Sequence, residues 1–273
     1  MAETTRFAPS PTGLLHLGHA YAAWFAQDAA SGGRFLLRLE DIDRTRCRAE
    51  FETAIFADLA WLGLAWEQPV RRQSEHLAQY QAALDRLAGA GLLYPCFCSR
   101  ADIAAAGAAP QGPDGPIYPG TCRSLAAGEI DRRLAAGVPY ALRLDMARAT
   151  AGMAPLRFTD REAGTIDALP EQSGDIVLAR KEMPTSYHLA VTVDDAAQGV
   201  TLVTRGRDLL PATHLHRLLQ ALLDLPVPDY HHHRLITDAG GRRLAKRDRD
   251  LTLASLRAAG VTPAELRARL AIG

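Results

Sequence analysis

The first 39 residues constrain the fold of this chain most strongly. A short β-like run from Thr4 to Ala8 breaks at the Gly/Pro-rich turn 9–13, and an Ala-rich helical stretch then begins near His19 and ends at residues 31–33. Residues 34–39 follow as a second strand. Strand, turn, helix and strand in this order predict a βαβ unit, which belongs to a parallel sheet in an α/β fold. In such a sheet, ligands bind at the carboxyl ends of the strands.

The rest of the chain alternates between helical and extended patterns around one irregular segment. Residues 104–120 hold four Pro and four Gly among seventeen positions, so we expect no regular secondary structure there. This segment lies between Cys98 and Cys122, and something other than a hydrophobic core has to order it. Apolar spacing predicts helices over 50–64, 75–90 and 213–223, and strands over 176–178, 189–193 and 200–203.

Composition excludes several classes of protein. The 273 residues include 31 Lys+Arg and 31 Asp+Glu, and this zero net charge argues against a nonspecific polyanion binder. The sequence contains no run of about 18 apolar residues and no secretory leader, so we expect a cytoplasmic protein without a membrane span. Four Cys in a chain of this length predict reduced thiols rather than a disulfide framework.

Two histidines occupy the turn between the first strand and its helix. His16 and His19 lie where backbone amides at a helix start attract phosphate, and Gly13 and Gly18 permit close approach of a ligand. Imidazoles in this place can donate hydrogen bonds to a developing phosphate charge, which indicates a nucleotide site. Taken alone, the same two histidines would also fit a structural role in capping or lining the helix.

Five motifs in order favour the nucleotide site. They are RFAPSPTG with HLGH at 6–19, LEDIDR at 39–44, DLAWLGLAW at 58–66, VTRGRDLL at 203–210 and GGRRLAKR at 240–247. Together they closely resemble the signature elements of class I aminoacyl-tRNA synthetases of the glutamyl branch. The resemblance implies a Rossmann-type parallel sheet with an inserted zinc-bearing α+β domain and a short C-terminal helical segment. It places the two halves of the catalytic core at 1–93 and 185–250, the insertion at 94–184 and a helical remnant at 251–273.

The resemblance also implies a ligase that activates glutamate with ATP. Glutamate carries two carboxylates and one ammonium, so its pocket needs guanidinium groups for the anions and a carboxylate for the amine. Arg6 and Arg205 match the guanidinium positions, and Glu40, at the end of the second strand, matches the ammonium site. Without the motifs, Glu40 and Arg205 would indicate an ordinary exposed ion pair. The residues expected to bind glutamate are Arg6, Phe7, Ala8, Pro9, Ser10, Glu40, Tyr187 and Arg205.

The expected ATP site combines the histidine turn with a basic C-terminal patch. From His231 onward, nine Arg or Lys stand against four Asp or Glu, a local charge of +5. Lys246, one of only two Lys in the chain, matches the lysine of the family's KMSKS loop that meets the ATP phosphates. A compact, rotatable ammonium suits such a moving contact, although a basic stretch standing alone would indicate a solvated loop. Arg243 and Ala245 depart from the family pattern in this loop.

The resemblance therefore assigns specific roles in catalysis and ATP binding. The expected catalytic residues are His16, His19 and Lys246. The residues expected to bind ATP, which enters with Mg²⁺, are His16, Gly18, His19 and Lys246.

Three cysteines surround the irregular segment. Cys96, Cys98 and Cys122 could hold one zinc ion and so order that segment, although small buried Cys are common and four zinc ligands are usual. The spacing C-x-C with Y-x-x-x-C is similar to the zinc site of one glutamyl-type subfamily, which implies Tyr118 as the fourth ligand of one structural Zn²⁺. Residues 231–233 are three consecutive histidines. We expect them to be structural, because consecutive side chains on a strand cannot all face one ion.

The length points to one branch of the family. Only 27 residues follow Lys246, too few for the anticodon-binding domain of a glutamyl-tRNA synthetase, so the chain resembles the truncated paralogues, the glutamyl-Q tRNA(Asp) synthetases. This implies a monomer that forms glutamyl-adenylate from L-glutamate and ATP. The glutamyl group would then pass to a hydroxyl of queuosine in the anticodon of tRNA(Asp). Two alternatives stay open: glutamylation of a tRNA 3′ end, and a catalytically silent RNA-binding paralogue.

Overall fold

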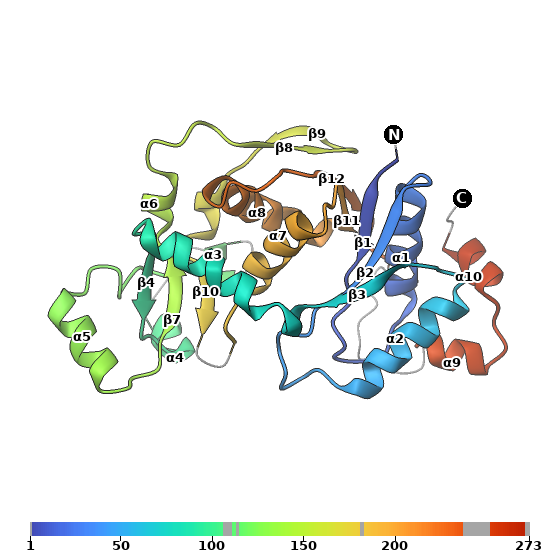
Figure 1. The fold of residues 1–273 in the computed structure, drawn as a ribbon, viewed down its shortest axis with the longest axis horizontal. Coiled ribbons are helices and arrows are strands. Elements are labelled where there is room, and N and C mark those ends of the chain that lie inside the picture. Colours follow the sequence, from blue (N-terminus) through green and yellow to red (C-terminus); the bar gives the residue numbers. More distant parts are fainter. Residues whose placement is uncertain (1, 106–110, 113–114, 181–182, 237–251, 271–273) are drawn as a thin grey trace.

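The opening βαβ unit forms where the sequence predicts it. β1 (Thr4–Phe7) and β2 (Arg34–Leu39) pair in parallel, and α1 (Leu17–Ala29) crosses between them (Figure 1). The helix begins two residues before the expected start because His16 caps it. The structure is a computed structural model, and it describes residues 2–105, 111–112, 115–180, 183–236 and 252–270.

A seam between β1 and β11 joins the two halves of the parallel sheet. β3 (Glu67–Arg72) pairs with β2 on one side, and β11 (Leu202–Gly206) pairs with β12 (Asp229–His233) on the other. At the seam, the backbone N–H of Thr201 donates to the carbonyl oxygen of Thr4 at 3.0 Å. The strands therefore run in the order β3, β2, β1, β11, β12. The chain adds its early strands on one side of the seam and its later strands on the other, and α/β sheets open a crevice for ligands where the strand order reverses in this way.

Helices cover this sheet, and one of them corrects the sequence prediction. Residues 189–193 are not a strand but part of α7 (Tyr187–Ala197), in which four consecutive residues from Leu189 to Thr192 are buried. A short apolar run buried on all sides cannot be assigned to strand or helix by periodicity. The N-cap Ser186, which accepts from the N–H of Leu189, is the local signal for the helix. The other covering helices are α2 (Ala49–Trp61), α3 (Leu77–Gly89), α8 (Leu210–Leu222), α9 (Leu253–Ala258) and α10 (Pro263–Arg269), with single turns η1 (Gln73–Glu75), η2 (Pro170–Ser173) and η3 (Arg207–Leu209).

A second, antiparallel sheet lies at the far end of the molecule from α9 and α10 (Figure 1). Its strands run in the order β10 (Val177–Arg180), β7 (Ala141–Leu144), β4 (Leu93–Cys96). The segment expected to be irregular includes a short ladder of β5 (Gln111–Gly112) and β6 (Gly115–Pro116), so that expectation is partly wrong. Two-residue strands tolerate Pro and Gly because they need almost no continuous pairing. The accompanying helices are α4 (Arg100–Ala105), α5 (Ala127–Ala135) and α6 (Met146–Thr150).

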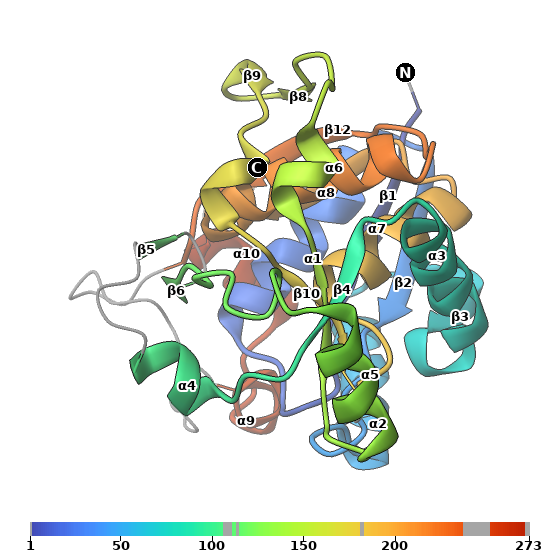
Figure 2. The same ribbon diagram turned by 90° about the vertical axis from the view of Figure 1, so that its left-hand side faces the viewer.

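A hairpin from the middle of the chain returns to the parallel sheet. β8 (Arg157–Asp160) and β9 (Gly164–Asp167) pair with each other, and Asp160 of β8 stands opposite Tyr230 of β12. Figure 2 shows the hairpin on the opposite side of the molecule from α4 and α5. Residues 94–184, the expected insertion, therefore contribute to both sheets. The three boundaries between the four expected segments stay predictions.

Two apolar clusters stabilise the two ends of the molecule. One packs α1, α2 and the first strands against the C-terminal helices, where Leu253 and Leu266 are fully buried. The other packs α3, α7 and α8 against β7 and β10. In the described part of the chain, no helix is both long and apolar enough to cross a membrane.

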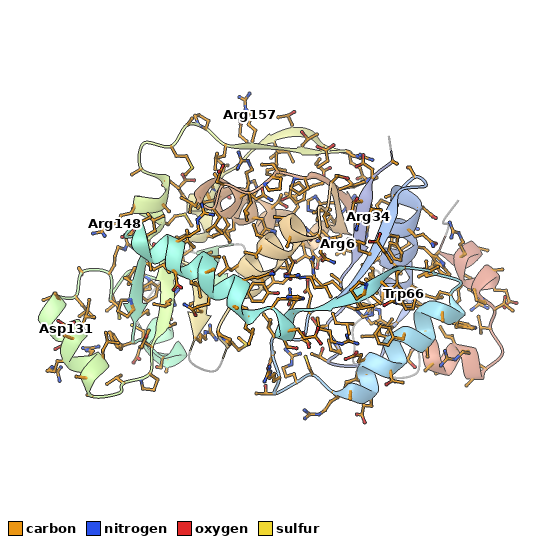
Figure 3. All side chains as sticks on the ribbon, in the orientation of Figure 1. Arg6, Arg34, Trp66, Asp131, Arg148 and Arg157 are labelled. Carbon is orange, nitrogen blue, oxygen red and sulfur yellow. The ribbon has the colours of Figure 1, made fainter. Side chains whose placement is uncertain are left out.

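A buried network of charges links these elements at the centre. Arg38 on β2 is fully buried, and its guanidinium lies 2.8 Å from Asp195 and 3.7 Å from Asp194. Asp194 also accepts from Arg71 (2.8 Å), from the Gln73 side chain (2.7 Å) and from the Tyr80 hydroxyl (2.8 Å). Figure 3 shows Arg6, another member of this network, near the middle of the molecule, whereas Asp131 and Arg148 lie at its edge.

The Asp194 carboxylate tests this network. We expect Asp194→Ala to lower the free energy of unfolding by about 3–5 kcal/mol, because it removes the one carboxylate that pairs with Arg71 among the described residues and one of the carboxylates beside the buried Arg38. Asp131, exposed on α5, offers a matched control whose change to Ala should cost less than about 0.5 kcal/mol. Urea unfolding followed by circular dichroism measures both values. Similar, small losses in the two variants would contradict a central role for the network.

Candidate active site

A pocket of about 420 Å³ opens at the seam between the two halves of the sheet. It lies at the carboxyl ends of β1, β2 and β11, where an α/β sheet is expected to bind its ligand. The α7 helix closes one wall through Tyr187. We call this cavity the strand-end pocket; it is lined by Arg6, Phe7, Ala8, Ser10, Ala22, Glu40, Tyr187, Thr204, Arg205, Gly206 and Leu209.

The strand-end pocket brings together residues that lie up to 203 positions apart in the sequence, from Arg6 to Leu209. Seven of the eight residues predicted to bind glutamate are among its lining residues. The eighth, Pro9, is buried beside it, and its carbonyl oxygen accepts the backbone N–H of Glu40 at 3.0 Å. Pro9 therefore holds the backbone from which the Glu40 carboxylate enters the pocket.

Arg6 enters the pocket from β1, and three N–H groups of its guanidinium already form hydrogen bonds within the protein. Its Nε and Nη2 donate to the two carboxylate oxygens of Asp195 at 2.9 and 3.3 Å, and its Nη1 donates to the carbonyl oxygen of Thr204 at 3.0 Å. A guanidinium has five N–H groups, and these bonds leave one on each Nη. Arg6 can thus offer a ligand carboxylate its outer edge, while Asp195 holds the inner one.

The pKa of Asp195 fits this clamping role. Burial acts to raise the pKa of its carboxyl group, but the neighbouring Arg6 and Arg38 outweigh burial and lower it. Asp195 therefore remains a carboxylate and keeps Arg6 oriented.

Arg205 differs from Arg6 because its hydrogen-bond partners carry no charge. Its Nε lies 3.2 Å from Nε2 of His232, its Nη1 3.1 Å from Nδ1 of His216, and its Nη2 2.6 Å from Oγ1 of Thr213. Among the residues that the structure describes, no carboxylate forms an ion pair with Arg205, although the residue is only 6% exposed. A buried cation without an anion is costly, so the pocket is suited to an anionic ligand at this point.

The two imidazoles beside Arg205 are held neutral and in one tautomer each. Burial and the nearby Arg205 lower the pKa of His216 well below its usual value and that of His232 to about 4. Since a guanidinium can only donate, the ring nitrogens that face it must accept. The proton of His232 then lies on Nδ1, which donates to the buried carboxylate of Asp160 at 2.7 Å.

Glu40 is the acidic group of the strand-end pocket. Burial raises the pKa of its carboxyl group to about 7, against the lowering effects of Arg38 and Arg6. Its carboxylate lies 3.7 Å from Arg38, longer than a hydrogen bond. A ligand ammonium placed against Glu40 would favour the ionised form and complete its surroundings.

The histidine turn serves as the N-terminal cap of α1. Nδ1 of His16 accepts from the N–H of Gly18, and Nδ1 of His19 accepts from the N–H of His16, both at 3.1 Å. The neutral rings therefore carry their protons on Nε2. A Cβ atom on Gly18 would lie 3.0 Å from the His16 ring, so glycine permits this close packing. Capping and phosphate binding are compatible, because capping uses Nδ1 and leaves the N–H on the other nitrogen.

The basic loop that carries Lys246 is flanked by residues tied to the histidine turn. Lys246, with Arg243 and Ala245, lies outside the described residues. The chain is described again from Thr252, which forms a β-bridge with His16, and the N–H of Leu253 donates to the carbonyl oxygen of Leu15 at 2.9 Å. The first described residues after this segment therefore lie beside the N-terminal cap of α1.

Three cysteines meet at the end of β4. The sulfur atoms of Cys96, Cys98 and Cys122 all lie within 4.8 Å of one another. The Tyr118 hydroxyl lies 3.5 Å from the sulfur of Cys98 and accepts the N–H of Cys122 at 2.8 Å. A tetrahedral zinc ion with Zn–S bonds of about 2.3 Å separates its sulfurs by about 3.8 Å, so this donor set is compatible with zinc. The arrangement brings together all four residues predicted as ligands.

Comparison with known proteins decides the family. Residues 3–271 match the family described as class I tRNA synthetases (E and Q), catalytic domain. The chain belongs to this family. Membership in the class I synthetases confirms the predicted ligase class and, with the parallel sheet at its centre, the predicted fold class.

Individual class I synthetases match over most of the chain. A glutamyl-Q tRNA(Asp) synthetase from Rhodobacter capsulatus is 52% identical, with 96% of this chain and 98% of the relative covered. The protein of the same name from Nocardia farcinica is 47% identical over 97% of this chain and 82% of its own length. The crystal structure of a glutamate tRNA ligase from Elizabethkingia meningosepticum in complex with its amino acid has a TM-score of 0.74 and 29% identity. This chain, aligned over 92% of its length, spans about half (53%) of that structure.

Several residues that contact the lining of the strand-end pocket are not indicated by the sequence patterns. Asp195 escaped notice because its helix was predicted as a strand, and Asp160 lies in no motif. His232 was grouped with its two neighbours as structural, although side chains alternate along a strand and place it on the other face from His231 and His233. That alternation was the available signal for His232. The contact of Thr213 and His216 with Arg205 left no pattern beyond a buried polar position on a helix.

Proposed function

We propose that this chain activates L-glutamate with ATP and transfers the glutamyl group to queuosine in the anticodon of tRNA(Asp). The observation that carries the proposal is the buried guanidinium of Arg205, which lines the strand-end pocket and faces only neutral partners among the described residues. Glutamate supplies the missing anion. The names of the relatives that match over 82–98% of their own length support the same reaction.

The charges of the pocket complement free glutamate. Arg205 and the outer edge of Arg6 bind carboxylate oxygens, and Glu40 binds the α-ammonium. Tyr187 closes the pocket, and burial raises the pKa of its hydroxyl, which stays protonated as a hydrogen-bond donor. Phe7, Ala8 and Ser10 also line the pocket and contact the bound amino acid.

Activation joins the bound amino acid to ATP. An oxygen of the α-carboxylate attacks the α-phosphorus, the bond from that phosphorus to the bridging oxygen of pyrophosphate breaks, and pyrophosphate leaves. His16 and His19 donate from Nε2 to the phosphate oxygens, and Lys246 neutralises the charge that develops on them. Gly18 lets the His16 ring pack closely at the start of α1, where backbone N–H groups attract phosphate. Mg²⁺ enters with ATP and supplies further charge neutralisation.

Transfer then releases AMP. A hydroxyl oxygen of queuosine attacks the acyl carbon of glutamyl-adenylate, and the bond from that carbon to the phosphate oxygen breaks. The proton of the hydroxyl leaves with AMP or with solvent. The alternative acceptor, a tRNA 3′ end, is less well supported, since this chain covers only 58% of the glutamate–tRNA ligase 2 from Nitrosococcus oceani and is 38% identical to it.

The cysteine cluster completes the proposal. Cys96, Cys98, Cys122 and Tyr118 bind one structural Zn²⁺, which orders the chain between β4 and α5. We further propose that the enzyme acts as a monomer in the cytoplasm, where ATP and tRNA are available to it.

ATP–pyrophosphate exchange tests the first half-reaction. The purified protein should exchange labelled pyrophosphate into ATP only when glutamate is present, without RNA. In the second step, labelled glutamate offered with bulk tRNA should label only tRNA(Asp) that carries queuosine. Exchange that does not depend on glutamate, or labelling of RNA that lacks queuosine, would contradict the proposal.

The role of Arg205 is testable with a neighbouring control. We expect Arg205→Gln to raise the KM for glutamate in the exchange reaction at least about 30-fold, because a buried charged contact is lost. Arg207, two residues away and 58% exposed in its side chain, pairs with Glu162 outside the pocket. Arg207→Gln should change KM less than about twofold. Equal effects in the two variants would argue against an anion site at Arg205.

Glutamate binding should depend on the ionisation of Glu40. The free carboxyl group has a pKa of about 7, whereas the bound ammonium requires the carboxylate, so binding releases a proton below that pH. The KM for glutamate should therefore be constant above about pH 8 and rise towards tenfold per unit below pH 7. His216 and His232 stay neutral in this window because their pKa values are lowered. Exchange kinetics from pH 5.5 to 8.5 measure the slope, which should be absent in the weakly binding Glu40→Gln variant.

The zinc site has its own internal control. Cys98→Ser should release about one zinc per chain, measured by atomic absorption, and speed amide hydrogen exchange in residues 96–122 while leaving the parallel sheet protected. Cys47 lies outside the cluster, so Cys47→Ser should retain the metal. Unchanged metal content in the Cys98 variant would remove the assignment.

A further inference from the structure

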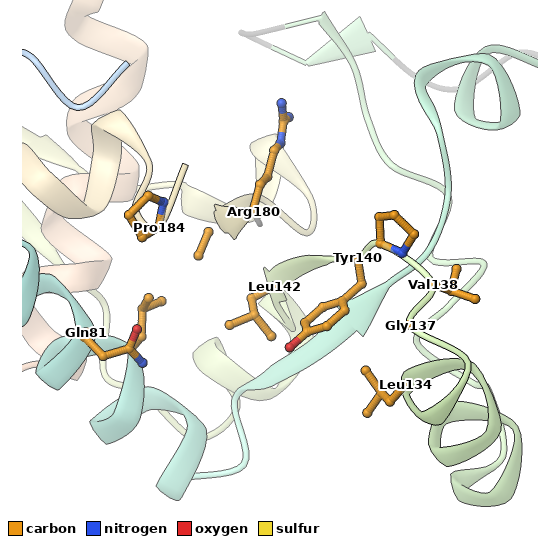
Figure 4. A pocket seen from close by; sticks show the side chains of 11 residues that line it. Gln81, Leu134, Gly137, Val138, Tyr140, Leu142, Arg180 and Pro184 are labelled. Atoms are coloured by element: carbon orange, nitrogen blue, oxygen red, sulfur yellow. The ribbon is translucent and has the colours of Figure 1, made fainter. Parts of the chain in front are cut away.

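A second pocket, of about 410 Å³, lies between α3, α5 and the antiparallel sheet. We call it the Tyr140 pocket. Figure 4 shows it between Gln81 on α3 and Leu134 on α5, with the ring of Tyr140 extending along it. Val138 and Arg180 form further parts of the lining, and the assigned glutamate, ATP and zinc residues take no part in it.

The walls of the Tyr140 pocket are unusually apolar for an exposed surface. Leu134 (40% exposed), Val138 (37%) and Tyr140 (41%) are three of the six large apolar side chains that are exposed in the described part of the chain. Apolar side chains gathered around a concave site indicate a binding surface, whereas single exposed ones are ordinary. The Tyr140 ring is supported from behind by Phe97, whose centroid lies 5.9 Å away.

The chain itself sets how close this pocket is to the strand-end pocket. Pro184 lines the Tyr140 pocket and Tyr187 lines the strand-end pocket. Three residues of extended chain span at most about 11 Å, so a wall of one pocket lies within that distance of a wall of the other. A nucleotide next to the one whose hydroxyl enters the strand-end pocket is therefore within reach of the Tyr140 pocket.

The chemistry of the Tyr140 pocket fits a nucleotide in particular. Unpaired bases bind proteins by stacking on aromatic rings, and the adjoining phosphate is held by arginine. Tyr140 offers the ring. Arg180 at the end of β10 is exposed and, among the described residues, has no carboxylate in ion-pair contact. The amide nitrogen of Gln81 donates to Asp85 at 2.8 Å, which orients its side-chain oxygen as an acceptor.

We infer that the Tyr140 pocket binds an unpaired base of the RNA substrate, next to the nucleotide that receives glutamate. Tyr140 stacks on the base, and Arg180 contacts its phosphate. This inference rests on the proposed function, because it assigns a subsite for the RNA of the second half-reaction. The first half-reaction uses no RNA and does not depend on the subsite.

The experiment compares the two half-reactions in full-length variants. Tyr140→Ala should raise the KM for queuosine-containing tRNA(Asp) between about fivefold and 150-fold, the range expected for losing one stacked base, with ATP–pyrophosphate exchange unchanged. Tyr140→Phe keeps the ring and should stay within about twofold of wild type. Val227, 45% exposed and outside this pocket, provides the control Val227→Ala, which should alter neither reaction.

The arginine gives an independent readout. Arg180→Ala should weaken RNA binding and reduce the slope of log affinity against log salt concentration by about one, as for one lost phosphate contact. Iodouridine placed beside queuosine should crosslink to a peptide containing Tyr140. Crosslinks confined to other peptides would overturn the inference.

Three outcomes separate the possible failures. If the wild-type protein shows no glutamate-dependent ATP–pyrophosphate exchange, the proposed function itself is wrong. If Tyr140→Ala transfers glutamate to the tRNA as well as the wild type does, only the proposed RNA subsite is wrong. A change of sedimentation in Tyr140→Ala, with RNA transfer intact, would show that the pocket seats a second copy of the chain instead.

Discussion

Two adjacent carboxylates on α7 hold the charged interior of this protein together. Asp194 accepts hydrogen bonds from β3, η1 and α3, and Asp195 accepts them from Arg6 on β1 and Arg38 on β2. Burying charges is expensive unless each finds a partner, so the position of α7 is specified by its charge pairs as well as by packing. Since α7 also carries Tyr187, the same pairs set the wall of the strand-end pocket.

The two arginines of the strand-end pocket are oriented by different kinds of hydrogen-bond partner. Asp195 holds Arg6 as an ion pair, which orients the guanidinium but cancels much of its charge. Arg205 is oriented by neutral imidazoles and a hydroxyl, which leaves its charge available to a ligand. Asp160 stabilises this arrangement at a distance through His232. One site thus provides a firmly held donor and an uncompensated cation, a combination suited to a ligand with two carboxylates and an ammonium.

The sequence predicts the parts of this molecule that depend on local pattern or motif. The opening βαβ unit follows from strand, turn and helix signals, and motif matching selected Arg6, Glu40 and Arg205, which the fold brings into one pocket. What it could not predict depends on tertiary burial. The apolar run in α7 has no helical period because it is buried on all sides, and once it was assigned to a strand, the network of Asp195 could not be deduced. Asp160 acts across 72 residues of chain, with no local signal.

The span of the strand-end pocket along the sequence has a consequence for how the protein is made. Its first residue, Arg6, is made long before His232, which is one of the three partners that orient Arg205 and lies on the last strand of the sheet. Contacts of such separation form late, because a long loop must close before they stabilise the chain. A nascent chain that stops before β12 therefore has the walls of the site without its aligned cation. The alignment of Arg205 in the strand-end pocket therefore depends on the last strand of the parallel sheet being in place.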